Sequence, residues 1–408
     1  MDATVKSKTY NRWIPVFACI AIQLCLGTAY IWGVFQPEVV KTLEWSQQQA
    51  ALTFSLLLVI LTLGSTIGGR IQDKLRPRPV IIGGGILLAV GFFWAGFVTK
   101  DMPWLLWIAY GALGGFGMGM TYTTTIAVCQ KWFPDRRGFI TGVIVSALGF
   151  GGLLFTPIAS ALIQHVGVME TFKWFALIFL AVTLLCGLII KNPPEGFKPK
   201  GWEPAAPKKG AAHVQDFTPR EMLKTPQFYM ITVMLMLASA AGLMVIPFAK
   251  VLGVDGGLSV EAATIGVMVI TGFNSFGRLF WGAVSDKLGR KKTILILLVA
   301  AAVSIPFAAL TQGYLILVFI ALVGFSYGGF LGVFPALTAD YFGIKSMGVN
   351  YGIVLLGFGA GAVVSAFLAG YFRDISGGFV TAFIIAACAA ILGIILTAFL
   401  KHPKLKEK

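Results

Sequence analysis

The feature that most constrains this chain is a series of apolar stretches, each about 20 residues long. A helix of about 20 apolar residues spans the hydrocarbon core of a bilayer, which is about 30 Å thick. Only 12% of the 408 residues are charged and 57% are hydrophobic, whereas soluble domains carry roughly 25% charged residues. We therefore expect an all-α membrane protein that has the lipid bilayer as its solvent.

The apolar stretches predict twelve transmembrane helices, with ends that are less certain than their centres. A polar segment rich in proline and lysine, residues 191–225, separates the first six spans from the last six and is typical of a linker. We expect an N-terminal six-helix bundle over residues 1–190 and a C-terminal six-helix bundle over 226–408. The expected spans cover about 13–36, 49–72, 79–99, 103–128, 138–163, 171–190, 226–249, 261–285, 292–311, 314–339, 347–370 and 378–400.

The distribution of basic residues predicts how the chain is oriented. The net charge is +15, and 26 of the 32 lysines and arginines fall in segments that this topology places on one side. Such an excess marks the cytoplasmic side of a multi-pass protein. It predicts that both termini lie in the cytoplasm and that the protein resides in the plasma (inner) membrane. Because this orientation explains the positive charge, a nucleic-acid partner is not needed to account for it. Lys6, Lys8 and Arg12 precede a first span without a cleavage site, so we expect no cleavable signal peptide.

The two halves contain similar motifs in the same order, which indicates an internal repeat. Span two ends in Gly69-x-x-x-Asp73-Lys74 and span eight in Gly282-x-x-x-Asp286-Lys287-Leu288-Gly289-Arg290. Four glycines in span five match four in span eleven at one constant offset: Gly138, Gly142, Gly149 and Gly151 with Gly348, Gly352, Gly359 and Gly361. The glycines Gly111, Gly115 and Gly119 leave one face of span four open to close approach by a neighbouring helix.

The repeated motif resembles the signature of the major facilitator superfamily, although the first copy has Arg76 in place of a glycine. This resemblance implies two pseudo-symmetric six-helix bundles that alternately expose a central site to the two sides of the membrane. It also implies that the charged residues at these helix ends act in gating. They are Asp73, Asp286, Arg290, Asp135 and Arg136. Solvated loops on the positive side would explain the basic residues but not Asp73 and Asp286.

Arg278 lies inside span eight, eight residues before Asp286 and hence roughly 12 Å within the membrane. Inserting an arginine there costs about 2.5–3.5 kcal/mol, so such residues usually mark substrate or ion sites. A guanidinium can bind a carboxylate in bidentate fashion; the alternative is a structural arginine bound by helix carbonyls. In the register of the repeat, the first half has Ser65 at this place. Asn274, one turn earlier, could donate to the same carboxylate or cap neighbouring backbone.

Several stretches narrow the resemblance to two groups of carboxylate carriers. The segments Glu221–Phe228, Trp132–Gly138 and Asn350-Tyr351-Gly352 resemble the oxalate–formate antiporters, and the stretch from Gly138 to Gly151 also resembles the animal monocarboxylate transporters. Both groups have an arginine at the position of Arg278. The antiporter has a second cation, a lysine, where this chain has Phe358. A dicarboxylate held by Arg278 alone would leave an uncompensated buried charge, which costs about 3–5 kcal/mol.

Resemblance to the antiporter's aromatic cage suggests three tyrosines as further pocket residues: Tyr30, Tyr122 and Tyr327. Leu331 and Phe334 follow Tyr327 on the same helical face and could contact an apolar tail, together with Phe358. Aromatic residues in membrane helices more often serve packing or lipid contact, and that interpretation stays open for each.

These patterns predict a secondary active transporter of small monocarboxylates such as L-lactate or pyruvate, working by proton-coupled symport and alternating access. The alternative is an oxalate–formate-type antiporter. Monocarboxylate transporters have an acidic residue where this chain has Asn274, so a coupling proton would need Glu38, Glu261, Asp340 or the substrate itself. The histidines lie outside mid-span positions, so we expect no enzyme activity, no cofactor and no metal. We expect a monomer.

Overall fold

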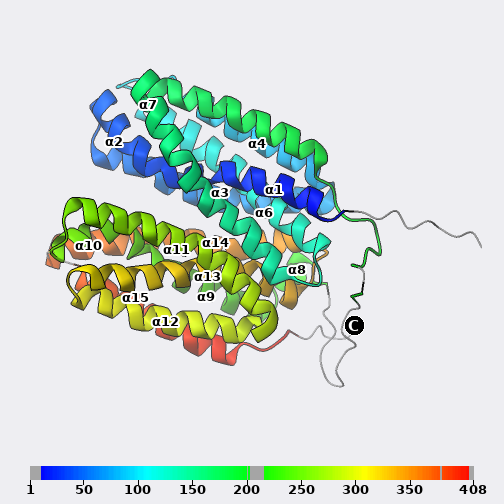
Figure 1. Cartoon of the computed structure of the whole chain (residues 1–408). Helices are drawn as coiled ribbons and strands as arrows, with labels where there is room; N and C mark the ends of the chain where they lie inside the picture. Colours follow the sequence, from blue (N-terminus) through cyan, green and yellow to red (C-terminus); the bar gives the residue numbers. More distant parts are fainter. Residues whose placement is uncertain (1–10, 200, 203–215, 377–378, 404–408) are drawn as a thin grey trace, which may run out of the picture.

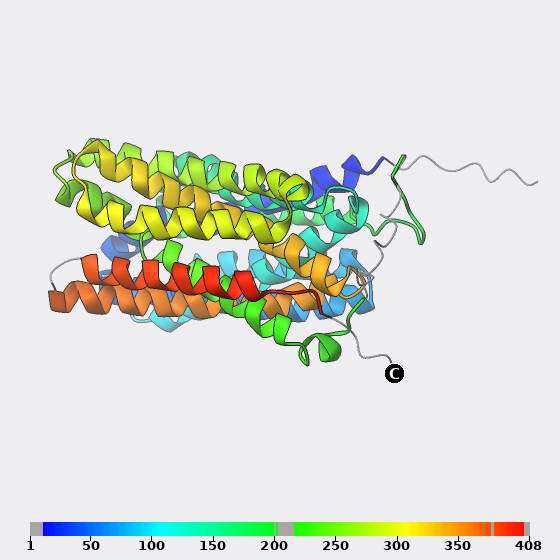
Figure 2. The same cartoon turned by 90° about the horizontal axis from the view of Figure 1, so that it is seen from below.

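The computed structural model describes residues 11–199, 201–202, 216–376 and 379–403. Within these ranges the chain is helical, without strands, and its long helices run along one common axis (Figures 1 and 2). Ten helices of the described part of the chain are long and apolar enough to cross a membrane. The longest reverses direction at Gly167 and supplies two spans, and residues 103–132 supply one more. The expected all-α fold with twelve transmembrane helices is confirmed.

The first six spans form the N-terminal bundle. Gly167 has φ +81° and stands alone between two helices, so the loop that we expected between spans five and six is a single residue. The elements are α1 (Trp13–Leu26), η1 (Gly27–Ile31), α2 (Trp32–Leu43), α3 (Gln47–Lys74), α4 (Pro77–Ala95), α5 (Pro103–Leu106), η2 (Trp107–Gly114), α6 (Gly115–Trp132) and α7 (Arg137–Ile189).

The last six spans form the C-terminal bundle, preceded by one short helix. Residues 203–215, which include Lys208, Lys209 and Gly210 of the expected linker, lie outside the described residues. The elements are α8 (Pro219–Met222), α9 (Pro226–Leu243), η3 (Ile246–Phe248), α10 (Ala249–Asp255), α11 (Val260–Leu288), α12 (Arg290–Leu310), α13 (Tyr314–Phe342), α14 (Met347–Ser376) and α15 (Val380–Phe399).

The first helix of each bundle is interrupted at the same place. In the N-terminal bundle α1 passes through the 3₁₀ turn η1 into α2, and in the C-terminal bundle α9 passes through η3 into α10. A 3₁₀ turn winds more tightly than an α-helix and changes the direction in which side chains point. Because Tyr30 lies on η1, this interruption decides where its ring is placed.

The paired glycines confirm the pseudo-symmetry. A Cβ at Gly142 of α7 would come within 2.6 Å of the Arg278 carbonyl of α11, and a Cβ at Gly352 of α14 within 2.7 Å of the Ser65 carbonyl of α3. Glycine therefore lets α7 approach α11 in one place and α14 approach α3 in the other. The pairing also confirms that Ser65 is the counterpart of Arg278. Gly111, Gly115 and Gly119 face α3, as the spacing predicted.

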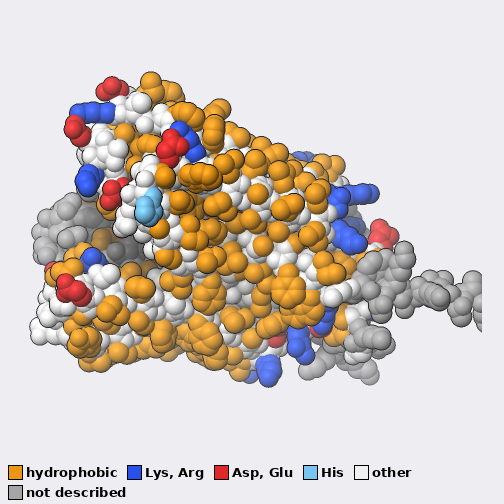
Figure 3. Space-filling model, turned by 45° about the horizontal axis from the view of Figure 1, so that its top comes forward, with side chains coloured by type: hydrophobic (Ala, Val, Ile, Leu, Met, Phe, Trp, Pro, Cys, Tyr) orange, Lys and Arg blue, Asp and Glu red, His pale blue; other side chains and the backbone are white. Residues whose placement is uncertain are grey.

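The surface has an apolar belt with charged residues gathered at the two ends (Figure 3). We call the end that holds Arg12, Lys191 and Leu400 the linker end, and the opposite end the far end. The described chain begins before α1 and ends after α15 at the linker end (Figures 1 and 2). Among the described residues, the hydrogen bonds that join the two bundles lie between Tyr30 and this linker end.

Candidate functional site

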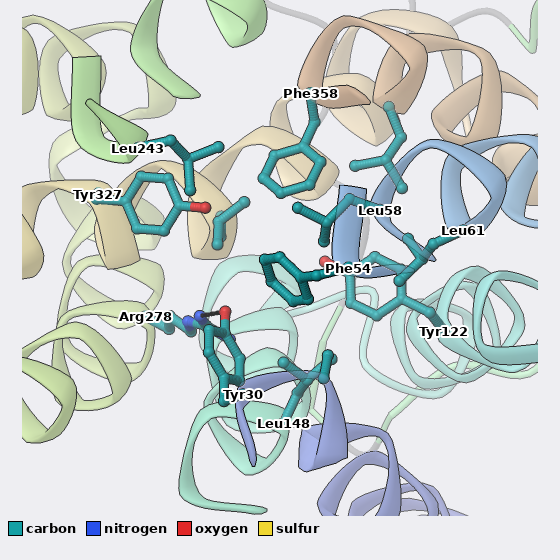
Figure 4. Close-up of a pocket in the computed structure, with 13 residues that line it drawn as sticks. Tyr30, Phe54, Leu58, Leu61, Tyr122, Leu148, Leu243, Arg278, Tyr327 and Phe358 are labelled. Carbon is teal, nitrogen blue, oxygen red and sulfur yellow. Dashed lines mark hydrogen bonds between the residues drawn. The ribbon is translucent and has the colours of Figure 1, made fainter. Parts of the chain in front are cut away.

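A cavity lies between the two bundles, and Arg278 borders it. Both bundles contribute side chains to its wall, as Figure 4 shows. The wall is mainly leucine and aromatic, and Arg278 is its one charged residue among those described. The lining residues are Ala29, Tyr30, Phe54, Leu58, Leu61, Tyr122, Leu148, Leu243, Arg278, Tyr327, Leu331, Leu355 and Phe358.

The guanidinium of Arg278 is held by three neutral acceptors. Its Nε donates to Asn274 Oδ1 at 3.1 Å, one turn back on α11. Its Nη1 donates to the Val145 carbonyl of α7 at 2.9 Å, and its Nη2 donates to the Tyr30 hydroxyl at 2.6 Å. Val145 and Tyr30 belong to the N-terminal bundle, so the arginine joins the two bundles at the centre of the molecule.

Close packing on both sides fixes the helix that carries this arginine. Gly142 of α7 and Gly332 of α13 each face the backbone of Arg278, where an added Cβ would lie within 2.6 Å and 2.5 Å of its carbonyl oxygen. Real Cβ atoms cannot approach that closely without a shift of the helices. The cation is therefore fixed in position by the backbone around it as well as by its hydrogen bonds.

The structure brings together most of the residues expected at the site. Tyr30, Tyr122 and Tyr327 reach the cavity from three different helical elements, and Leu331 and Phe358 complete its wall. Tyr122 and Tyr327 are nearly fully buried. Figure 4 shows the Tyr30 ring beside Arg278 and Phe358 across the cavity from it.

Two expected residues lie outside the cavity wall. Asn274 turns its Oδ1 to Arg278, so it supports the arginine from behind. Phe334 is fully buried and its ring lies 6.4 Å from that of Phe330. It follows Leu331 toward the linker end of α13, where the bundles close, and so lies past the floor of the cavity.

The expected set lacked seven residues of the wall, most of them leucines: Ala29, Phe54, Leu58, Leu61, Leu148, Leu243 and Leu355. The repeat contains the signal that would have located some of them. The offset that relates the glycines of spans five and eleven also relates Leu148 to Phe358, and the offset that relates Ser65 to Arg278 relates Tyr30 to Leu243. Pocket positions in one half thus predict pocket positions in the other.

Two aspartates of the repeated motif close the linker end in the same way. Asp286, near the end of α11, accepts from the backbone N–H groups of Gly138 and Phe139 at 2.9 and 2.7 Å, in the first turn of α7. Asp73, at the end of α3, accepts from the N–H of Val349 at 2.8 Å, in the first turn of α14. The first turn of a helix has free N–H groups and a partial positive charge. Each carboxylate therefore caps a helix of the opposite bundle.

An ion-pair network supports only one of these two contacts. Arg290 donates to Asp286 at 2.7 Å and to Asp340 at 2.9 Å, and Arg137 of the other bundle donates to Asp340 at 3.2 Å. Asp73 has Lys131 at 3.7 Å. Among the residues expected to gate, Asp73, Asp286 and Arg290 thus lie between the bundles.

The remaining two residues expected to gate lie elsewhere. Asp135 pairs with Arg12 inside the N-terminal bundle, at 2.7 Å. Arg136 is exposed and precedes the first residue of α7 without capping it by a side-chain hydrogen bond. Its neighbour Arg137 makes the contact with the other bundle, and sequence reasoning missed it.

The segment before α8 is bound to the turn that precedes α14. Asp216 accepts from the N–H groups of Ile344 and Lys345 at 2.9 and 3.1 Å. Phe217 is buried, donates its N–H to the Phe342 carbonyl at 2.9 Å, and accepts from Asn350 Nδ2 at 3.0 Å. Asn350 is the residue after Val349, so this segment holds the helix end that Asp73 caps.

The comparisons with known proteins agree with this architecture. The family model of the Major Facilitator Superfamily matches residues 17–279 and 257–408. The oxalate:formate antiporter of Oxalobacter formigenes is 30% identical, over 95% of this chain and 91% of its own. Monocarboxylate transporter 13 of Rattus norvegicus is 25% identical, over 93% and 87%. The crystal structure of the transporter FucP in the outward conformation superposes with a TM-score of 0.75 and 15% identity, covering 96% of this chain and all of that one.

Proposed function

The chain belongs to the major facilitator superfamily of membrane transporters, and we propose that it carries small monocarboxylates such as L-lactate or pyruvate. The observation that supports this most is the single cation in the cavity wall, Arg278, opposite leucine and phenylalanine side chains. A guanidinium offers a planar fork that fits a carboxylate. A monocarboxylate neutralises that charge and leaves its apolar end for the opposite wall.

The shape of the wall supports a short substrate with one charged end. Tyr122 and Tyr327 present hydroxyl groups near the arginine, which suit a 2-hydroxy or 2-oxo oxygen. Leu58, Leu61 and Phe358 are the apolar side for a methyl group. Burial of such a group contributes about 0.8 kcal/mol per carbon, so the carboxylate contact dominates the affinity.

An oxalate–formate-type antiporter is the second candidate, and the 30% identity to the oxalate:formate antiporter over nearly the whole chain favours it. The charge balance weighs against it. Oxalate bound at Arg278 would retain one uncompensated negative charge in the cavity, at a cost of about 3–5 kcal/mol. Phe358 offers no charge to offset it.

Coupling to a proton is part of the proposal, with alternating access as the transport cycle. No carboxylate lines the cavity among the described residues. The proton is therefore taken up with the acid itself or at carboxylates of the linker end such as Asp340.

We further propose that the protein is a monomer of the plasma (inner) membrane with the linker end in the cytoplasm. The excess of basic residues at the linker end supports this orientation.

The experiment that tests the proposal is uptake of labelled L-lactate, formate and oxalate into liposomes that contain the purified protein, with and without an inward proton gradient. Arg278→Gln is measured alongside, because a glutamine can keep some of the arginine's hydrogen bonds while removing the charge. Lys292→Gln removes one positive charge at an exposed position of α12 and is the matched control.

Accumulation of lactate that depends on the gradient, is lost in Arg278→Gln and persists in Lys292→Gln is the expected result. Exchange of oxalate without effect of the gradient would instead identify an antiporter. Lactate transport that survives in Arg278→Gln would refute the role of the arginine as the substrate's partner.

A further inference from the structure

Tyr30 covers the cation of the cavity. Arg278 is buried to 1% exposure, whereas Tyr30, which accepts a hydrogen bond from it, is 41% exposed. The tyrosine hydroxyl is 2.6 Å from Arg278 Nη2, and the guanidinium carbon lies 5.6 Å from the centre of the tyrosine ring. Figure 4 shows the ring standing directly beside the guanidinium. A molecule that enters the cavity therefore meets Tyr30 before it meets the charge.

The hydrogen bonds of the guanidinium use three of its N–H groups, and one of the three faces the cavity. Of its five N–H donors, one serves Asn274, one serves Val145 and one serves Tyr30. Asn274 and Val145 lie behind the arginine, on the packed helices α11 and α7. The Tyr30 hydroxyl is the acceptor on the cavity side, and the 3₁₀ turn η1 that carries it is less tightly bonded than an α-helix.

We propose that the Tyr30 hydroxyl is a placeholder for the substrate carboxylate on Arg278, displaced when substrate binds and restored when it leaves. This inference rests on the proposed function, since it needs a carboxylate at Arg278. The Tyr30 hydroxyl occupies the cavity side of Nη2, where a carboxylate would have to bind, so the two groups compete for the same position. The tyrosine is neutral, and a carboxylate forms the stronger, charge-assisted bond.

The placeholder has a consequence for the transport cycle. A buried guanidinium without acceptors on its cavity side would carry the cost of an unsatisfied charge. With Tyr30 as acceptor, the carrier that holds no substrate keeps its arginine satisfied and can change conformation. Without the hydroxyl, the carrier that holds no substrate is destabilised, while the stability of the loaded carrier does not change. Net transport, which needs the unloaded carrier to return, then slows more than exchange does.

The test is Tyr30→Phe, which keeps the ring and removes the hydroxyl. L-lactate binding to the purified full-length protein is measured by calorimetry. Exchange and net efflux of labelled L-lactate are measured from liposomes at equal pH on both sides. We expect the Kd to fall about tenfold, because the carboxylate no longer displaces a competitor; this corresponds to about 1.4 kcal/mol. We expect the ratio of exchange to net efflux to rise by a similar factor.

Two other tyrosine variants separate this role from a merely structural one. Tyr327→Phe removes a cavity hydroxyl that does not bond to Arg278, and it should weaken binding and slow both flux modes together. Tyr314→Phe alters an exposed residue at the far end of α13 and reports on folding. Unchanged or weaker lactate binding in Tyr30→Phe, or an unchanged flux ratio, would overturn the placeholder alone. Absence of carboxylate binding to the unaltered protein would refute the proposed function, and the placeholder with it.

Discussion

Replacement of Asp286 by asparagine should open the linker end. The carboxylate of Asp286 accepts from Gly138 and Phe139 of α7 and from Arg290. An asparagine of the same shape has one acceptor oxygen, and its amide nitrogen would face a donor. The variant therefore loses the charge and at least one of these hydrogen bonds, while the helices themselves keep their packing.

The size of the effect follows from these contacts. A hydrogen bond to a charged group contributes about 1.5–3 kcal/mol, and a charge at a helix N-terminus adds about 0.3–1 kcal/mol. Because the Asp286 side chain is 17% exposed, solvent screening is modest. The closed linker end should lose about 2–4 kcal/mol, which shifts the equilibrium by about 30-fold to several hundred-fold.

Asp73→Asn should open the linker end by a smaller amount. Asp73 accepts from Val349 at 2.8 Å, and its cation Lys131 stands at 3.7 Å. No arginine of the kind that supports Asp286 is bound to it among the described residues. We expect a loss of about 1–2 kcal/mol, from one charged hydrogen bond and a weak ion pair.

The assay is a distance measurement between spin labels at the linker end. The labels replace the exposed Arg76, at the start of α4, and Lys292, on α12 of the other bundle, in a background without the exposed Cys388. The expected result is a longer-distance population that is largest in Asp286→Asn, smaller in Asp73→Asn and smallest without either change.

The control is Glu44→Gln, which removes an exposed carboxylate that pairs with Lys100 at the far end. It should leave the distance distribution unchanged. If Asp286→Asn also left it unchanged, or if Asp73→Asn had the larger effect, the argument from helix capping would be wrong.

Three further outcomes follow. Phe358→Lys should allow labelled oxalate to exchange and should weaken L-lactate uptake, because the second cation offsets the charge that Arg278 leaves; no gain in oxalate exchange would contradict the charge argument. Gly142→Ala should slow transport and lower the free energy of unfolding by about 1–3 kcal/mol, because the added Cβ overpacks the helix contact. Gly33→Ala, where no atom lies within 4 Å of the new Cβ, should change neither transport nor stability. Asp216→Asn should increase the open population in the spin-label assay, since its carboxylate binds two N–H groups before α14; an unchanged population would mean that this segment does not support the closed end.

The fold was predictable because lipid imposes a strong length and polarity rule on each span. The centres of the spans follow from that rule and agree with the helices of the structure, and the repeat, inferred from its motifs, agrees with the glycine contacts. The ends were less predictable where a local break decides them. The first span continues through η1 to Leu43 instead of ending near residue 36, and Gly167 replaces an expected loop. Such breaks depend on packing between helices, which periodicity does not report.

The candidate site was predictable in its charge and less so in its wall. A single arginine inside an apolar span is easily recognised in the sequence. A leucine that lines the cavity cannot be distinguished by sequence from a leucine that faces lipid. Phe334 shows the limit of helical spacing: it shares a face with Leu331 but lies past the cavity floor.

The glycine that is missing from the first copy of the motif is explained by the backbone. Gly289 has φ +90°, whereas Arg76 is extended, as a residue before proline prefers, so no glycine is needed there.

The distribution of charge between the two bundle contacts gives them different roles. The contact between α7 and α11 contains both Arg278 and, eight residues further, Asp286, and each makes hydrogen bonds across the bundle boundary. The equivalent contact between α3 and α14 has Ser65 in place of the arginine and keeps only the aspartate, Asp73. Because eight residues of helix are rigid, a carboxylate that displaces the Tyr30 hydroxyl from the guanidinium, as we propose, would act on the same helix that closes the linker end. On this proposal substrate acts directly on one of the two contacts, and the other follows through the packing of the bundles.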